Sequence, residues 1–183
     1  MAYILGYKHF WKHKFLTDKS VLIPRPDTEL VIEETLNFDF PIIPISGSIS
    51  SLELFQGPTL AFKDVGARFM ARCLAYAHEV KEQKKLTILV ATSGDTGGAV
   101  ADGFFKVEGI DVVILYPKGK VSEVQEKQMT TLGQNIIALE VDGTFDDCQN
   151  MVKSVSNKFP NLVQTWSKQC PTLVQTWCKY ALE

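Results

Sequence analysis

The stretch Thr87-Ile-Leu-Val-Ala-Thr-Ser-Gly-Asp-Thr-Gly-Gly98 decides the fold of this chain. Its first five residues are rich in apolar and β-branched side chains, which is typical of a buried strand. The next seven include three glycines, and a helical pattern follows to about Phe105. A strand, a glycine-rich turn and a helix in this order indicate an α/β unit. Its loop would leave the carboxyl end of the strand, where parallel sheets bind ligands.

The same alternation extends outward over residues 38–159. We predict strands at 52–55, 87–91, 111–116 and 135–141, and helices from near Lys63 and at about 96–105, 122–132 and 144–159. Strands separated by such helices imply right-handed crossovers and a parallel sheet. The predicted fold class is α/β, with an open parallel sheet of about four strands, helices on both faces, and irregular N- and C-terminal appendages.

The helix that begins near Lys63 carries apolar residues at one helical period. They are Val65, Phe69, Cys73, Tyr76 and Val80. Arg68 and Arg72 fall on another side, which we expect to be solvated. Asp64 is expected to cap its own helix.

Lys63 itself is a candidate for covalent chemistry. It follows a Gly-Pro turn and an apolar cluster in Leu52-Glu-Leu-Phe-Gln-Gly-Pro-Thr-Leu-Ala-Phe-Lys-Asp64. Poor solvation and the positive end of a helix both disfavour the ammonium form of a lysine. A neutral amine is what Schiff base formation with an aldehyde requires. From position alone, an ordinary surface lysine is the alternative.

Three strings carry a resemblance to a known family: Leu52–Asp64, Leu89–Val100 and Leu115–Gln128. Through them, residues 37–159 resemble the middle of threonine synthases, over about two-thirds of this chain and a minority of a full-length family member. The resemblance implies a partial tryptophan-synthase-β-like fold and pyridoxal 5′-phosphate as the cofactor. It also implies conversion of O-phosphohomoserine and water to threonine and phosphate.

The resemblance implies roles for single residues as well. Lys63 would be catalytic and hold the cofactor as a Schiff base. The implied cofactor-binding residues are Lys63, Thr92 and Asp95, and the implied substrate-binding residues are Ser93, Gly94, Thr96 and Lys120. Lys120 lies in Pro117-Lys-Gly-Lys120, for which an exposed basic turn and a phosphate-binding role are equal alternatives. No metal ligand is predicted.

Two features of the family are not found in residues 134–183. One is a second glycine-rich loop, of the Ser-Gly-Asn-x-Gly type, which wraps the cofactor phosphate. The other is a hydroxyl residue that contacts the pyridine nitrogen. Because the phosphate supplies much of the anchoring, we expect weak cofactor binding and weak or no activity from this chain alone.

The two ends differ from the middle, so we divide the chain into segments 1–37, 38–159 and 160–183. Residues 3–36 resemble the segment before the catalytic domain of release-factor glutamine methyltransferases, through Tyr3–Gly6 and the turn-forming Ile23–Glu29. In the tail, Pro160–Lys168 recurs as Pro171–Lys179. The chain is therefore expected to be chimeric or truncated. Alternative functions are a methyltransferase remnant, or an interaction module that uses Trp166 and Trp177.

Composition limits the partners. The 183 residues carry a net charge of −2, which gives no reason to expect nucleic acid or a membrane as a partner. No signal peptide or membrane-spanning run is visible. The four cysteines show no Cys-x-x-Cys spacing, which favours reduced thiols and a cytoplasmic location. The expected partner is a small-molecule substrate, and the oligomeric state stays open.

Overall fold

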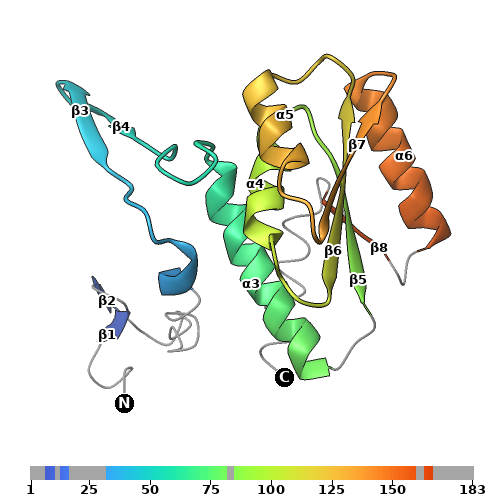
Figure 1. Ribbon diagram of the computed structural model, residues 1–183. Helices are drawn as coiled ribbons and strands as arrows, with labels where there is room; N and C mark the ends of the chain where they lie inside the picture. Colours follow the sequence, from blue (N-terminus) through green and yellow to red (C-terminus); the bar gives the residue numbers. More distant parts are fainter. Residues whose placement is uncertain (1–6, 11–12, 17–31, 82–84, 160–162, 167–183) are drawn as a thin grey trace.

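The computed structural model of the protein describes residues 7–10, 13–16, 32–81, 85–159 and 163–166. Its centre is a four-stranded sheet with the strand order β7-β6-β5-β8 (Figure 1). The strands are β5 (Leu86–Ala91), β6 (Ile110–Pro117), β7 (Ile136–Val141) and β8 (Val163–Trp166). All three pairings are parallel. The predicted α/β class with a parallel sheet of about four strands is confirmed.

Helices cover both faces of the sheet (Figure 1). One face carries α3 (Lys63–Lys81), α4 (Asp95–Phe104) and α5 (Glu123–Thr130). The other face carries α6 (Phe145–Lys158). The boundaries agree with the predicted helices to within about two residues for α4, α5 and α6, because each start has a recognisable local signal.

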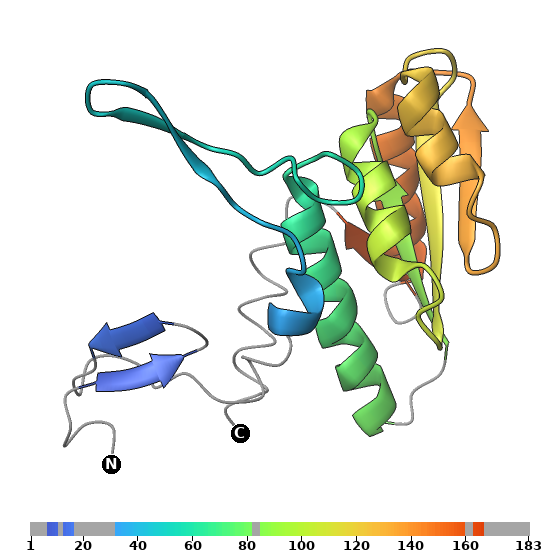
Figure 2. The ribbon, with the colours of Figure 1, turned by 60° about the vertical axis from the view of Figure 1, so that its left-hand side comes forward.

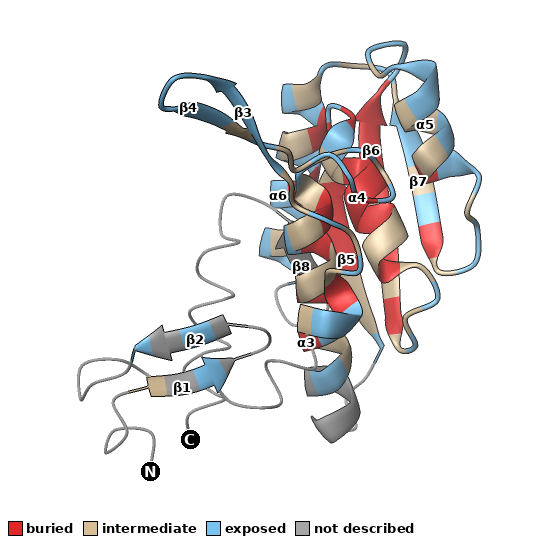
Figure 3. Cartoon of the chain, turned by 90° about the vertical axis from the view of Figure 1, so that its left-hand side faces the viewer, coloured by how far each residue is buried: buried red, intermediate tan, exposed pale blue. Residues whose placement is uncertain are grey.

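Two hydrophobic clusters fill the space between the sheet and its helices. The larger one lies under α3, α4 and α5 and includes Ile88, Val90, Val100, Phe104 and Ile114. The smaller one lies under α6 and consists of Leu89, Leu115, Cys148 and Val152. Figure 3 shows the buried residues concentrated in the inner strands and in α4. Alternate residues of β5 therefore serve opposite layers, as expected for a strand covered on both faces.

The prediction that residues 52–55 form a strand of the parallel sheet is wrong. Residues 53–55 lie outside any strand, and β4 (Ile49–Leu52) instead pairs antiparallel with β3 (Ile42–Ser46). Gly47, at a φ of 53°, opens the connection between these strands, and a tight turn of this kind favours a hairpin. The hairpin extends away from the body (Figure 2). The fourth place in the sheet is taken by β8, from the segment predicted as a tail.

The buried face of α3 also differs from the prediction. Of the predicted face, Cys73 is buried, Val65 and Phe69 are half-buried, and Tyr76 is 63% exposed. The side chain of Val80 lies outside the described residues. Ala67, Met70 and Ala71 are buried instead. Small residues define this face because α4 approaches closely. A Cβ placed on Gly103 of α4 would lie 3.1 Å from the backbone carbonyl carbon of Ala67.

The N-terminal part contributes small local elements. β1 (Tyr7–Phe10) and β2 (His13–Leu16) form an antiparallel hairpin, and residues 32–35 form a short helical turn. The predicted turn at Ile23–Glu29 and the second copy of the tail repeat lie outside the described residues. Within the described part of the chain, no helix has the length and apolar character needed to cross a membrane.

Candidate functional site

The candidate site is formed where two helices begin. Lys63 is the first residue of α3 and Asp95 is the first residue of α4. The Lys63 Nζ lies 3.1 Å from the Asp95 Oδ2 and 4.2 Å from the centroid of the Phe62 ring. The Lys63 side chain is 28% exposed and that of Asp95 is 48% exposed. The amine predicted from the sequence therefore meets the carboxylate of the glycine-rich loop.

The strand order explains why the site lies at this end of the sheet. The chain passes from β5 to β6 and then to β7, and returns through α6 to β8 on the other side of β5. The helices that follow β5 and β7, α4 and α6, consequently lie on opposite faces of the sheet. In open parallel sheets such a reversal creates a crevice at the carboxyl ends of the strands. The loop that follows Ala91 emerges there.

Thr92 organises this loop from inside the protein. Its side chain is buried, and its Oγ1 accepts hydrogen bonds from the backbone N–H groups of Gly94 at 3.0 Å and Gly97 at 2.9 Å. Gly94 has a φ of 141°, a backbone conformation that favours glycine. Ser93 is exposed at the surface of the loop. Thr92 thus shapes the turn, and Ser93 and Asp95 present side chains outward.

A second layer of polar residues, not predicted from the sequence, supports the loop. Gln125 of α5 donates from Nε2 to the Asp95 Oδ1. Gln128, one helical turn later, donates from Nε2 to the Thr59 carbonyl oxygen at 3.3 Å. Two glutamines three residues apart share a helix face, which is the only sequence signal that could have indicated them.

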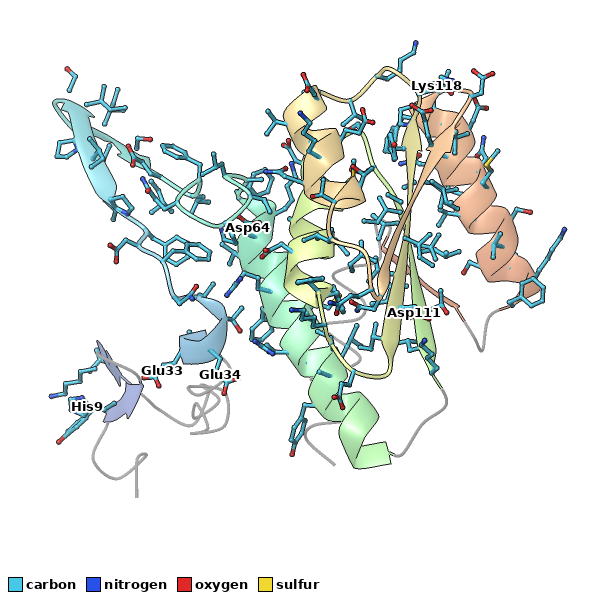
Figure 4. The ribbon with its side chains drawn as sticks, in the orientation of Figure 1. His9, Glu33, Glu34, Asp64, Asp111 and Lys118 are labelled. Atoms are coloured by element: carbon cyan, nitrogen blue, oxygen red, sulfur yellow. The ribbon has the colours of Figure 1, made fainter. Side chains whose placement is uncertain are left out.

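Asp64 does not cap its own helix, so that expectation is wrong. It is fully buried and accepts hydrogen bonds from the Thr59 N–H at 2.9 Å and from the Thr59 hydroxyl. Figure 4 shows Asp64 at the start of α3, beside the loop that precedes the helix. A side chain at this position can turn back toward the preceding loop, and here Thr59 supplies two donors. Asp64 therefore fixes the approach of the chain to Lys63.

Arg68 is not on a solvated face either, whereas Arg72 is exposed as predicted. The Arg68 Nη1 lies 3.2 Å from the Asp102 Oδ2, and its Nε donates to the Thr35 carbonyl oxygen at 2.9 Å. Burial raises the pKa of Asp102 above its usual range, although the adjacent Arg68 guanidinium opposes this effect. This cluster joins α3, α4 and the chain near Thr35 behind the site.

The basic turn after β6 is less closely connected to the site. Gly119, at a φ of 62°, and Lys120 lie in the turn that leads to α5. Lys120 is exposed, and Lys118 lies 3.8 Å from Glu140 across to β7. Figure 4 places Lys118 at the carboxyl end of β6 and Asp111 at the opposite end. Thr96, in the first turn of α4, is half-buried.

These residues fit an aldehyde cofactor. A lysine amine that is partly open to solvent, beside a glycine-rich turn at a helix start, supplies a nucleophile and a position that favours an anionic group. No cluster of three or more histidine, cysteine or acidic residues suited to a metal ion occurs among the described residues. The fold and the geometry of the site are typical of the class of enzymes in which a lysine at the edge of a parallel sheet binds a carbonyl cofactor.

Comparisons with known proteins identify the family. A family model described as pyridoxal-phosphate dependent enzyme matches residues 51–183, and the chain belongs to this family. Its description names the cofactor predicted from the sequence. Threonine synthase from Buchnera aphidicola subsp. Baizongia pistaciae is 55% identical over 127 residues, covering 69% of this chain and 29% of that protein. Threonine synthase from Escherichia coli K12 is 48% identical over 131 residues, covering 72% and 30%.

Solved structures agree with the sequence comparison. The crystal structure of threonine synthase from Escherichia coli aligns with a TM-score of 0.69 and 43% identity, over 78% of this chain and 34% of that one. Threonine synthase from Brucella melitensis with bound pyridoxal phosphate aligns with a TM-score of 0.72 and 39% identity, over 80% and 33%. The resemblance to threonine synthases and the partial fold are confirmed. The chain spans about three-tenths of the length of the curated relatives it matches.

Proposed function

We propose that this chain is the lysine-bearing module of a threonine synthase, which binds pyridoxal phosphate and acts on O-phosphohomoserine. The observation that carries the proposal is the 3.1 Å contact between the Lys63 Nζ and the Asp95 Oδ2 at the carboxyl edge of the sheet. The 39–55% identity to the threonine synthases named above supports it. The buried thiols of Cys73 and Cys148 support a cytoplasmic location.

Each residue of the site would have a separate role in binding the cofactor or the substrate. Lys63 holds the cofactor and moves protons at its Nζ, and Asp95 orients that amine. The exposed Ser93 hydroxyl and the N–H group of Thr96 suit the substrate carboxylate, because a helix start favours an anion. Gly94 lines this position, and its own N–H is donated to the Thr92 Oγ1. When bound, the cofactor supplies an electron sink. Lys120 provides a positive charge for the substrate phosphate, and Thr92 acts by shaping the loop.

The test is reductive trapping of the cofactor on the protein. Pyridoxal phosphate is added, borohydride fixes any imine, and the labelled peptides are mapped by mass spectrometry. We expect Lys63 to carry most of the label, and Lys63→Ala to lose it. Lys127→Ala, which alters an exposed lysine paired with Glu123, is the matched control and should retain it. Equal labelling of several lysines would refute the proposal.

Turnover is a separate measurement. Threonine and phosphate formation from O-phosphohomoserine should be slow or undetectable for this chain alone, because residues 134–183 contain no loop of the Ser-Gly-Asn-x-Gly type for the cofactor phosphate. A rate typical of complete family members would contradict this expectation. Residues 3–36 as a methyltransferase remnant remain a prediction, which binding of S-adenosylmethionine would support.

A further inference from the structure

We infer that Gln125 is a positioning residue, which holds Asp95 against Lys63 from the neighbouring crossover helix. This inference rests on the proposed role of Lys63. Asp95 uses its two carboxylate oxygens in opposite directions. Its Oδ2 faces the Lys63 Nζ at 3.1 Å, and its Oδ1 accepts a hydrogen bond from the Gln125 Nε2. The carboxylate is therefore fixed between an amine and an amide.

Ser122 sets the orientation of the Gln125 amide. The Ser122 Oγ accepts the backbone N–H of Gln125 at 3.4 Å as the N-cap of α5, and donates its own proton to the Gln125 Oε1 at 3.0 Å. The amide carbonyl is thus directed to Ser122, and the amide nitrogen is left for Asp95. Since a carboxylate can only accept hydrogen bonds, this orientation is the one that Asp95 needs.

The loop is built to let this amide pass. A Cβ placed on Gly94 would lie 2.6 Å from the Gln125 Cδ, so the side chain crosses directly over the glycine. Gly94 is required there by its positive φ as well. The absence of a side chain at Gly94 gives Gln125 its path to Asp95.

A second contact from the same helix face holds the other side of the site. Gln128 donates to the Thr59 carbonyl oxygen, and Thr59 in turn donates twice to Asp64, which is adjacent to Lys63. α5 therefore connects the loop that carries Asp95 with the loop that leads to Lys63. Helix α5 sets the spacing of the two groups, although it contributes neither of them.

The expected chemical consequence concerns the reactivity of the amine. The Asp95 side chain is 48% exposed, so without Gln125 it would rotate among its rotamers and leave Lys63 for part of the time. While the carboxylate stays in contact at 3.1 Å, it covers part of the Lys63 Nζ and limits the approach of a reagent. Loss of the Gln125 donor should therefore make Lys63 react faster. An exposed ion pair contributes at most about 1 kcal/mol, which corresponds to about fivefold in rate.

The test measures acetylation of Lys63 by trace acetic anhydride, with mass spectrometry of the peptides and Lys127 as the internal reference. Gln125→Met keeps the size of the side chain and removes the donor. We expect it to raise the rate at Lys63 about fivefold. Gln149→Met, the same change on α6 at the other face, should leave this rate unchanged.

The mechanism is separated from simple loosening of the fold by combining substitutions. Asp95→Asn should raise the Lys63 rate by itself, and adding Gln125→Met should then have no further effect. If Gln125→Met is too unstable to study, Ser122→Ala provides a smaller change in the same direction, because it releases the orientation of the amide. An unchanged Lys63 rate, an equal rise at Lys127, or an additive double variant would overturn the inference.

The two proposals fail in different ways. If borohydride trapping does not label Lys63 in the unaltered protein, the proposed function is refuted. The acetylation series needs no cofactor and still reports on Gln125. If trapping succeeds and the acetylation rates do not respond to Gln125→Met, only the positioning role is refuted.

Discussion

The Asn135 Nδ2 donates to the Phe104 carbonyl oxygen at 2.8 Å, which joins the start of β7 to the last residue of α4. The same nitrogen donates to the Ile110 carbonyl oxygen at 2.9 Å, and the Asn135 Oδ1 accepts the Lys106 N–H at 2.9 Å. One amide thus closes the connection between α4 and β6. This connection lies at the end of the sheet opposite the candidate site, so its effect can be measured apart from Lys63.

We predict that Asn135→Ala lowers the free energy of unfolding by about 2–3 kcal/mol. Three hydrogen bonds are lost, two of them partly buried, and each contributes about 0.5–1.5 kcal/mol. The Phe104 carbonyl oxygen still accepts the Val107 N–H, so it is not left unsatisfied. Urea unfolding followed by circular dichroism measures the change. Asn150→Ala, at an exposed position of α6, is the control and should not lower stability. A difference below about 0.5 kcal/mol for Asn135→Ala would contradict the prediction.

The contact between Asp64 and Thr59 should appear as a coupling energy. Asp64→Ala and Thr59→Val are each expected to destabilise the protein, since each leaves a polar partner unpaired. Thr59→Val removes the hydroxyl bond and keeps the backbone N–H bond, whereas Asp64→Ala removes both. Because the hydroxyl bond is lost in each variant, the double variant should lose less than the sum, by about 1–2 kcal/mol. A double-mutant cycle from urea unfolding gives this number. Strict additivity would mean that the pair contributes nothing to stability.

Because of Asp147, we expect the free energy of unfolding to depend on pH in the acid range. Hydrogen bonds from the backbone N–H and hydroxyl of Thr144 hold the pKa of Asp147 below its ordinary value of 3.8. A lowered pKa in the folded state contributes stability that is present above pH 3.8 and is lost as the pH falls through the folded value. Asp147→Asn should therefore flatten the loss of stability below about pH 4.

The measurement for Asp147 is a series of urea unfolding curves between about pH 2 and 6. Asp146→Asn is the control, because Asp146 lies in the same helical turn outside the capping box. It should keep the acid limb of the unaltered protein. If Asp147→Asn also keeps that limb, the capping box does not explain the acid sensitivity.

For Asp102 we predict that stability changes with pH in the opposite direction. Burial raises its pKa above 3.8, and this outweighs the Arg68 guanidinium. A raised pKa in an acid contributes stability that is present below pH 3.8 and is lost as the pH rises through the folded value. The stability of the unaltered protein relative to Asp102→Asn should thus decline from about pH 3 to 6. Unfolding curves across this range decide the matter, and a relative gain with rising pH would contradict it.

Local signals explain which parts of the fold were predictable. The starts of α5 and α6 agree with the predicted helices at 122–132 and 144–159, because the capping residues Ser122 and Thr144 act within three positions of their partners. The loop after β5 was found because its glycines are required where they stand. Lys63 and Asp95 were each proposed separately, and the sheet topology brings them together.

The missed features depend on partners far away in the sequence. Arg68 resembles a solvated residue in its own helix, but it binds Asp102, which lies 34 residues later. Gln125 resembles an ordinary helix surface residue, but it reaches Asp95, 30 residues earlier. The pairing of β8 with β5 joins segments about 76 residues apart, as Thr87 opposite Val163 shows. The residue pattern within a single helix or strand does not indicate contacts between residues this far apart in the sequence.

The unequal cover of the two sheet faces should govern how this protein opens. Among the side chains that the structure describes, the cluster under α6 has four buried residues, whereas the cluster on the opposite face has fifteen. Segments with few buried apolar contacts have the lowest free energies of local unfolding, so their amide protons exchange fastest under native conditions. The amides of α6 should therefore lose their protons to solvent deuterium well before those of α4. Local unfolding would therefore begin on the face of the sheet away from Lys63. The amides of the layer that contains α3 and α4 would exchange more slowly.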